Sequence, residues 1–385
     1  SFTTEEWKKF LMRSAGLEPE LFSQRALMVV LLRMIPFVEK NYNLVEIGPR
    51  GTGKSHLYQQ ISPYSHLVSG GKATVAKMFV NNSTGQRGLV CQYDVVCFDE
   101  ISGISFDSKD GVNIMKGYME SGEFSRARES IRAEGCIVMV GNFDVDVEQQ
   151  QRIGHLLGTL PAEMRDDTAF HDRLHAFVPG WDFPKLKPKE HLTDHFGLVT
   201  DFLSECWSQM RESTRISALQ NRIFWGGALS GRDINAVQKT ISGLVKLIFP
   251  DPEMPISDDD LEEIVKTALE SRRRIKEQQK RCLKSEFRNT HFSYTLGVDG
   301  VEQFVGTPEL HSDEAIDEDP LPPGQVWCVG PGTGESGAGL YRIEATSGPG
   351  SGIKILNHPK PPAFNESVKV GEQNLYTRAK ELTGN

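Results

Sequence analysis

Residues 48–55 read GPRGTGKS, and this octet restricts the fold of the chain more than any other stretch. It lies between the apolar run LVEIG and the helix-forming run SHLYQQIS, the strand–loop–helix setting of a phosphate-binding loop. Backbone N–H groups can turn toward an anion only where glycines allow unusual dihedral angles, and the positive end of the next helix then faces the charge. We therefore predict a nucleoside triphosphate site in an α/β fold.

Within this loop, Lys54 is expected to reach the β- and γ-phosphates of ATP, and Ser55 to ligate Mg²⁺. The alternative interpretation is a glycine turn that simply precedes a helix. The residues expected to contact ATP are Gly48, Pro49, Arg50, Gly51, Thr52, Gly53, Lys54, Ser55 and His56.

A second motif, VVCFDE at 95–100, follows about forty residues later. Asp99, at the end of an apolar strand beside the loop, is expected to hold hydrated Mg²⁺, and Glu100 to polarise the attacking water. An ordinary strand ending in a turn is the alternative, but two agreeing motifs favour the nucleotide site.

Short apolar runs alternate with polar helical stretches from 44 to 180 and predict a parallel sheet covered on both faces. The strands are expected in LVEIG, TVAKMFVN, DVVCFDE, CIVMVGN and LHAFVPG. Thr3 and Glu6 form a capping-box pattern at the start of a helical N-terminus. The expected parts are an N-terminal helical segment (1–40), a large α/β subdomain (41–185), a helical lid with a basic helix (186–290), a linker region (291–323) and a C-terminal α+β part (324–385).

The net charge of −9 means that nucleic acid could be attracted only by a local patch or a pore. The six cysteines form no C-x-x-C pair, which favours reduced thiols in the cytoplasm and argues against a zinc site. The longest apolar run, 26–32, is too short to span a bilayer, so we expect no membrane association. Because the chain opens on Ser1, we also expect a segment upstream of it.

Three further polar residues fit the nucleotide site. Asn142 ends the run CIVMVGN, where it either lies beside the attacking water or caps the next turn. Arg173 precedes another strand and is expected to reach the γ-phosphate bound by a neighbouring subunit, with Arg165 as the alternative. Arg232 starts a helix of the lid and is expected to fold onto the nucleotide.

In this order, the two nucleotide motifs, the asparagine and the two arginines resemble the AAA+ ATPases, over roughly residues 20–270. The resemblance implies a ring, commonly a hexamer, with ATP at the subunit interfaces, and stacked rings remain an alternative. It also favours Arg173 over Arg165 as the arginine finger.

The segment 119–142 can form a β-hairpin before the strand of Asn142, like the pore hairpin of minichromosome-maintenance helicases. Arg126 and Arg128 near its tip would then meet DNA phosphates, whereas the alternative is a solvated surface hairpin.

Two other features leave alternatives open. Phe79 is either a pore aromatic that grips polypeptide or a buried residue of the sheet. A basic run is either a solvated helix face or a nucleic-acid contact. The run consists of Arg272, Arg273, Arg274, Lys276, Lys280, Arg281 and Lys284.

The C-terminal stretch GAGLYRIEATSGPGSGIKIL, followed by NESVKVGEQNLYTRAKEL, resembles the opening of a Lon-type protease domain. Together with STGQRGLVCQYDVVCFDEI and DRLHAFVPGW, it makes the chain similar, nearly end to end, to the Lon-related AAA+ ATPases of BREX bacteriophage-exclusion systems. The Ser–Lys dyad of Lon proteases is expected beyond Asn385, and no activating lysine pattern surrounds Ser367, so peptidase activity is not predicted.

The resemblance implies a cytoplasmic ATPase ring that acts with other BREX components and binds double-stranded DNA through its pore. Translocation and clamping are both left open. The alternatives are an ATP-dependent unfoldase or Lon-type protease, and a scaffold whose assembly is gated by nucleotide.

Overall fold

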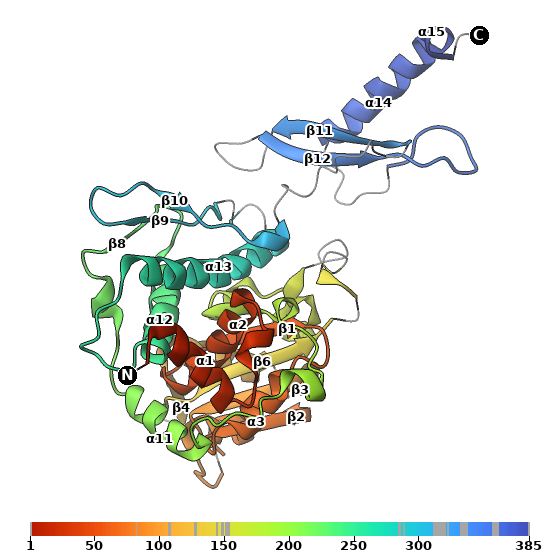
Figure 1. Ribbon diagram of the computed structural model, residues 1–385. Coiled ribbons are helices and arrows are strands. Elements are labelled where there is room, and N and C mark those ends of the chain that lie inside the picture. The colour runs from red at the N-terminus through yellow and green to blue at the C-terminus, as the bar shows by residue number, and fades with distance from the viewer. Residues whose placement is uncertain are drawn as a thin grey trace. The chain divides into compact units, whose positions relative to one another are not determined.

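In the computed structural model of the chain, a five-stranded parallel sheet forms the centre of the larger of two units (Figure 1). Its strand order is β2-β3-β6-β1-β7. The strands are β1 (Leu44–Gly48), β2 (Ser65–Ala73), β3 (Val95–Phe106), β6 (Cys136–Asn142) and β7 (Ala176–Pro179).

The two units are Ser1–Ser312 and Asp313–Asn385. The structure describes residues 2–383 apart from 82, 107–108, 127–128, 144, 148–149, 151–154, 284–285, 288, 311–320, 322, 332–337 and 356–361.

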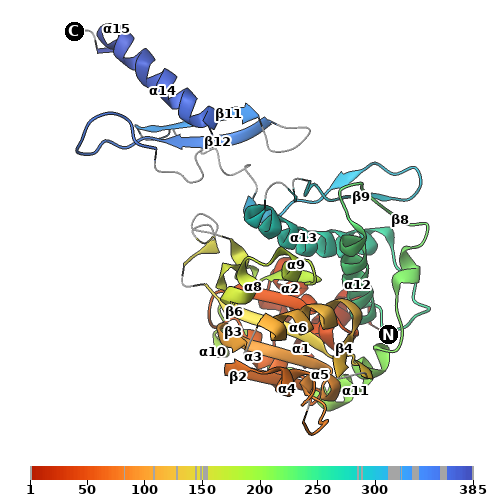
Figure 2. The ribbon, with the colours of Figure 1, turned by 180° about the vertical axis from the view of Figure 1, so that it is seen from behind.

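Alternate strand residues enter two hydrophobic cores, one on each face of the sheet. Leu44 belongs to the core that also contains the apolar sides of α2 (Gln24–Met34) and the lid, whereas Val45 belongs to the core under α6 (Lys109–Ser121). Figure 2 shows α6 on the face of the sheet that is turned away from the viewer in Figure 1. The parallel sheet with two covered faces is thus confirmed, because strands buried on both sides need apolar residues at every position.

One expected strand is wrong. TVAKMFVN forms the short helix α4 (Val75–Met78), while β2 lies in the preceding residues. The side chain of Thr74 accepts the N–H of Lys77, and such a cap satisfies a helix start in a segment whose valines suggested a strand.

Helices from the N-terminal segment, from the residues after the phosphate loop and from the lid pack around the sheet. The helix α1 (Thr4–Ser14) begins at the expected capping box of Thr3 and Glu6, and α3 (Lys54–Gln60) follows the phosphate loop. The lid contains α11 (Thr200–Met210), α12 (Gly231–Ile248) and α13 (Asp258–Cys282).

The lid region also contains strands, which the sequence analysis missed. A three-stranded sheet pairs β8 (Ile223–Trp225) with β9 (Ser293–Leu296), and β9 with β10 (Gln303–Phe304). The first part of the expected linker, 291–323, therefore belongs to the larger unit. Buried Tyr294 donates its hydroxyl to Glu262 of α13 and fixes this sheet to the lid.

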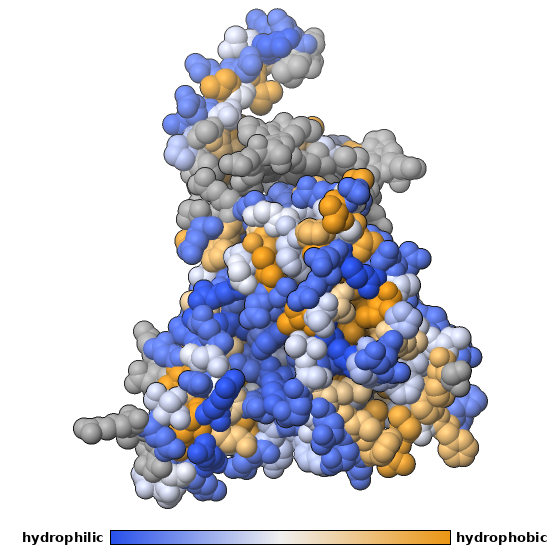
Figure 3. All heavy atoms as spheres, turned by 90° about the vertical axis from the view of Figure 1, so that its left-hand side faces the viewer, coloured by the Kyte–Doolittle hydropathy of each residue, from blue (hydrophilic) through white to orange (hydrophobic). Residues whose placement is uncertain are grey.

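The surface of the larger unit that carries β8 and β10 contains both apolar and hydrophilic side chains. Figure 3 shows apolar residues interspersed with hydrophilic ones there. Phe224 of β8 and Phe304 of β10 are among the exposed apolar side chains, at 43% and 66%. Single exposed apolar residues of this kind are normal on a protein surface.

A β-hairpin precedes β6, as predicted. It pairs β4 (Glu123–Arg126) with β5 (Glu129–Arg132), and it buries Phe124 and Ile131 in the core under α6. The side chain of Arg126 and the whole of Arg128 lie outside the described residues.

The smaller unit has an α+β composition, as expected. An antiparallel pair, β11 (Gln325–Pro331) and β12 (Ala338–Glu344), is followed by α14 (Pro362–Thr377) and α15 (Ala379–Thr383). Across both units, none of the helices in the described residues has the length and apolarity needed to cross a bilayer.

Candidate nucleotide site

The loop between β1 and α3 has the geometry of a phosphate cradle. Gly51 and Gly53 adopt φ angles of 81° and 73°, which side-chain-bearing residues rarely reach. A Cβ atom on Gly48 would lie 2.6 Å from the carbonyl carbon of Gly180, so the strand end also requires a glycine. The loop thus runs directly into the N-terminus of α3, where backbone N–H groups can face an anion.

Lys54 and Asn142 meet at the carboxyl edge of the sheet. The Nζ atom of Lys54 donates to the Pro49 carbonyl at 2.7 Å and to Oδ1 of Asn142 at 3.0 Å. Gly48 and Asn142 are paired in adjacent strands, which explains why the asparagine reaches the loop. Burial lowers the pKa of Lys54, so a phosphate that replaced these neutral acceptors would favour the charged ammonium.

Ser55 and Asp99 form the expected oxygen-ligand pair. The Ser55 hydroxyl donates to Oδ1 of Asp99 at 2.6 Å, and the same oxygen accepts the backbone N–H of Glu100 at 3.0 Å. Hydroxyl and carboxylate oxygens are the ligands that Mg²⁺ prefers, so the two residues fit this ion. Bound Mg²⁺ would supply neutralisation of the phosphate charge.

Glu100 follows Asp99 with its side chain exposed, and both lie within β3, which runs on to Phe106 instead of ending at Asp99 as expected. Its φ angle is 49°, in the left-handed region that non-glycine residues seldom occupy. Backbone strain of this kind concentrates at functional sites, where the surrounding structure maintains it.

A buried ion pair supports the loop from below, and the sequence analysis missed it. Arg33 donates to both carboxylate oxygens of Glu46 at 2.9 and 2.6 Å, and its Nη1 atom donates to the carbonyl of Thr52 at 3.1 Å. Both charged side chains are at most 1% exposed. The available signal was Glu46 itself, a charged residue inside the otherwise apolar run LVEIG.

The other expected loop residues differ in exposure. Thr52 is buried, whereas Arg50 and His56 are exposed. The N–H of Leu186 donates to the carbonyl of Gly51 at 2.8 Å, so the chain after β7 also packs on the loop.

Arg173 and Arg232 share one carboxylate, that of Glu120 in the last turn of α6. Arg173 contacts Oε2 and Arg232 contacts Oε1, each at 2.6 Å. Arg173 also donates to the Lys116 carbonyl, and Arg232 to Asp172 at 3.1 Å. The hydrogen bond from Arg232 is the main cause that lowers the pKa of Glu120.

This arginine pair lies at the amino edge of the sheet. Arg173 precedes β7, whose first residue, Ala176, pairs with Leu44 at the start of β1, whereas the phosphate loop follows the end of β1. The expectation that Arg232 folds onto the nucleotide of its own chain is therefore not met. The Ser230 capping box and the ion pairs of Arg232 hold the start of α12 at the opposite edge.

Comparison with known proteins shows the family of this chain. Residues 1–293 match the family model described as Lon-like protease BrxL-like, ATPase domain. The chain belongs to this BrxL-like family. Two curated relatives, both named Lon-like protease BrxL, come from Escherichia coli O9:H4 (strain HS) and Bacillus cereus (strain H3081.97).

The Escherichia coli relative is 46% identical over 96% of this chain and 53% of its own length. The Bacillus cereus relative is 44% identical over 100% of this chain and 56% of its own length. The chain thus spans about half the length of these BrxL-like relatives. Within the family, the matched part of the chain is the ATPase domain.

Three residues of the basic run in this BrxL-like chain are buried, and Lys284 lies outside the described residues. Arg272 is fully buried and pairs with Asp233 and Asp172, each at 2.8 Å. Arg274 and Lys276 are also buried in ion pairs. For these three residues, both the solvated face and the nucleic-acid contact are wrong, because their charges are paired inside the fold. Arg272 and Lys276 pair with Asp172 just before β7. Arg274 pairs with Glu270 of α13 and with Glu309.

Phe79 is also internal. It is 1% exposed, with ring centroids 5.5 Å from Tyr118 and 5.3 Å from Phe124. The pore-aromatic hypothesis is contradicted, and the alternative of a buried residue is confirmed, although Phe79 follows α4 rather than lying in a strand.

The two candidate finger residues lie in different places. Arg165 lines a cavity of about 410 Å³ together with Asn142, on the carboxyl side of the sheet. Arg173 lies at the amino edge with Glu120. The two candidate finger residues therefore lie at opposite edges of the sheet.

Proposed function

We propose that this chain hydrolyses ATP within a hexameric ring that belongs to a cytoplasmic BREX antiphage system. The observation that carries the proposal is the contact between Ser55 and Asp99 beside the pair of Lys54 and Asn142. In the proposal, the loop 48–56 holds the phosphates of ATP, Ser55 and Asp99 hold Mg²⁺, and Glu100 orients the attacking water.

The arginines act on the nucleotide of a neighbouring subunit. A ring with head-to-tail interfaces brings the amino edge of one subunit to the carboxyl edge of the next. Arg173 would supply positive charge to the transferred phosphoryl group, and Arg232 would act from the same edge. Glu120 holds both guanidinium groups until a phosphate competes for them.

Mixing two inactive variants tests this assignment. Arg173→Ala and Glu100→Gln subunits should each give rings with almost no ATPase activity. In equimolar mixtures, about a quarter of the interfaces combine an intact Glu100 with an intact Arg173, so activity should return. No recovery in rings that are shown to be mixed would contradict action on the neighbour.

We further propose that the ring binds double-stranded DNA through the hairpin β4–β5. Support comes from the hairpin itself, which carries Arg126 at the end of β4, with Arg128 following before β5 begins in the sequence. Replacing both by alanine should weaken DNA binding and reduce the slope of log K against log salt by ~0.9 for each phosphate that the protein no longer neutralises. Arg132→Ala, at the base of the same hairpin, is the matched control, and an unchanged slope would count against the proposal.

The second candidate function is ATP-dependent unfolding or proteolysis, which the names of the relatives favour. Buried Phe79 removes one route by which a pore could grip polypeptide. Steady-state hydrolysis with no addition, with duplex DNA and with unfolded protein separates the candidates. Stimulation by polypeptide alone would favour the unfoldase, and assembly that needs ATP binding with slow turnover would favour a scaffold.

A further inference from the structure

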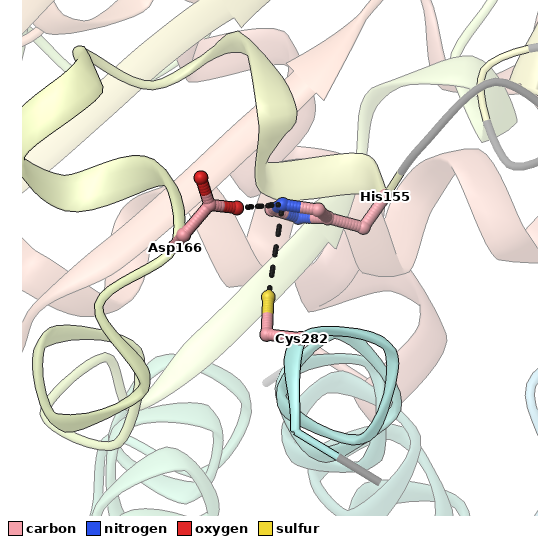
Figure 4. Close-up of side chains that lie close together, drawn as sticks. All are labelled: His155, Asp166 and Cys282. Carbon is pink, nitrogen blue, oxygen red and sulfur yellow. Dashed lines mark hydrogen bonds and ion pairs between the residues drawn. The ribbon is translucent and has the colours of Figure 1, made fainter. Parts of the chain in front are cut away.

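Three potential metal ligands meet away from the nucleotide site. They are His155, before the short helix η3 (Leu156–Thr159), Asp166, at the end of α8 (Ala162–Arg165), and Cys282, at the end of α13 (Figure 4). One ligand atom from each lies within 4.8 Å of the other two. Nε2 of His155 is 3.1 Å from Oδ1 of Asp166 and 3.7 Å from Sγ of Cys282.

Hydrogen bonds alone account poorly for this arrangement. The carboxylate and the sulfur both face the same ring nitrogen, which in a neutral imidazole either donates one proton or accepts one. If Nε2 carries the proton, it serves only one of the two neighbours. If Nδ1 carries it, a lone pair faces the carboxylate, and Nδ1 is buried with no hydrogen-bond partner among the described residues. A cation placed between the three atoms removes the conflict.

The spacing also fits a tetrahedral ion. With Zn–N and Zn–O near 2.1 Å and Zn–S near 2.3 Å, ligand atoms around zinc lie roughly 3.4–3.6 Å apart. The observed 3.1 and 3.7 Å lie within a few tenths of an ångström of these values. Neutral histidine, a thiolate and a carboxylate together would balance the charge of a divalent ion.

We propose that His155, Asp166 and Cys282 bind a Zn²⁺ ion, with water as the fourth ligand. The cysteine spacing gave no indication of zinc, because the three ligands come from segments as much as 127 residues apart. On binding, the Cys282 thiol loses its proton to solvent, and the sulfur and the ion form the new bond.

The surrounding contacts hold the ligands in place without the ion. Gln278 of α13 accepts the N–H of Leu156 at 2.7 Å, and Gln279 donates to the carbonyl of Thr168 at 2.8 Å. The ion would therefore reinforce an existing junction between the lid helix and the segment that carries Arg165, next to Asp166. The ion would act by joining these two segments, and the proposal does not depend on the ATPase proposal.

Cobalt substitution tests the site directly. The full chain, treated with chelator and titrated with Co²⁺ without nucleotide, should bind about one equivalent with the visible bands of a tetrahedral ion and a sulfur-to-cobalt charge-transfer band. Cys282→Ser should abolish the charge-transfer band and weaken binding at least ~10-fold, since even outer partners of a metal contribute ~10–100-fold. Cys206→Ser, which changes another half-exposed cysteine, should leave both unchanged.

A sulfur band separates this site from Ser55 and Asp99, which offer only oxygen. Zn²⁺ should also raise the melting temperature of the wild-type chain but not of the His155→Gln and Asp166→Asn variants, whose folding is checked by circular dichroism. A charge-transfer band that persists in Cys282→Ser, or equal zinc affinity of the wild type and all three variants, would overturn the proposal.

Discussion

The carboxyl and amino edges of the central sheet both gather charged side chains, but only the carboxyl edge takes most of them from recognisable short motifs. At the carboxyl edge, the main residues come from two short motifs, 48–55 and 95–100. At the amino edge, Arg232 reaches Glu120 across 112 residues. The residues of the first edge can therefore be found from motifs, although the contacts of Ser55 with Asp99 and of Lys54 with Asn142 span 44 and 88 residues. At the second edge, Arg232 joins Glu120 only when the lid docks on the sheet.

The two edges also differ in exposure. The pair of Arg33 and Glu46 under the phosphate loop is at most 1% exposed, whereas the side chains of Glu120 and Arg232 are 42% and 54% exposed. Exposed ion pairs contribute little to stability, so Arg232 can leave Glu120 at small cost, whereas Arg173 is 16% exposed and also donates to the Lys116 carbonyl. The difference suggests a rigid cradle at one edge and an exchangeable contact at the other.

The largest effect should come from the amino edge. Arg173→Ala is expected to lower kcat by ~10³–10⁵-fold, the range for loss of an arginine finger. Arg165→Ala is the matched control and should have a much smaller effect in the same steady-state assay. The reverse order would move the finger to the carboxyl side of the sheet.

The buried pair should dominate stability. Glu46→Gln leaves the Arg33 charge buried without its carboxylate and should lower the free energy of unfolding by about 3–5 kcal/mol, measured by urea denaturation. The double variant Arg33→Met with Glu46→Leu should recover most of this stability. Arg232→Ala, at the exposed edge, should cost less than about 1 kcal/mol; equal decreases at both edges would remove the distinction between them.

Loss of the water-orienting carboxylate should separate binding from chemistry. Glu100→Gln is expected to lower kcat by roughly 10²–10³-fold, within the range for a general base. ATP affinity, measured by calorimetry, should change little because the phosphate loop is intact. Glu253→Gln, an exposed acid far along the chain, is the control. A variant that hydrolyses ATP normally would exclude the assigned role.

The smallest effect concerns pH and His175, which lies next to the amino edge. Burial lowers the pKa of His175 well below its usual value, and its Nδ1 atom accepts the N–H of Asn43. Below about pH 6.5 the unfolded chain binds a proton that the folded chain does not, so stability should fall by up to ~1.4 kcal/mol per pH unit as the pH decreases.

Unfolding curves between pH 7 and pH 5 measure this slope. His175→Gln should reduce it, while buried His171, whose pKa burial lowers to about 4, keeps its own contribution. An identical slope in His175→Gln would show that this histidine does not contribute.

Structural features that depend on residues close together in the sequence could be predicted. The strand–loop–helix setting of 48–55, the capping box of Thr3 and the β4–β5 hairpin rest on local spacing, and all three are present in the structure. The strand in TVAKMFVN was wrong because the cap at Thr74 outweighs the preference of valine for strands. Arg232 and the basic run could not be placed, because their partners lie in distant elements and only the folded chain determines which charges become buried.

The last turn of α6 links two features of the molecule. Glu120, which holds the two arginines, is followed by Gly122 with a φ angle of 74° and then by the first strand of the hairpin. The carboxylate of Glu120 and the first strand of the hairpin are thus connected by a short segment that contains Gly122. A shift at the end of α6 can therefore reach the hairpin both through this glycine and through the packing of Phe124 against Tyr118.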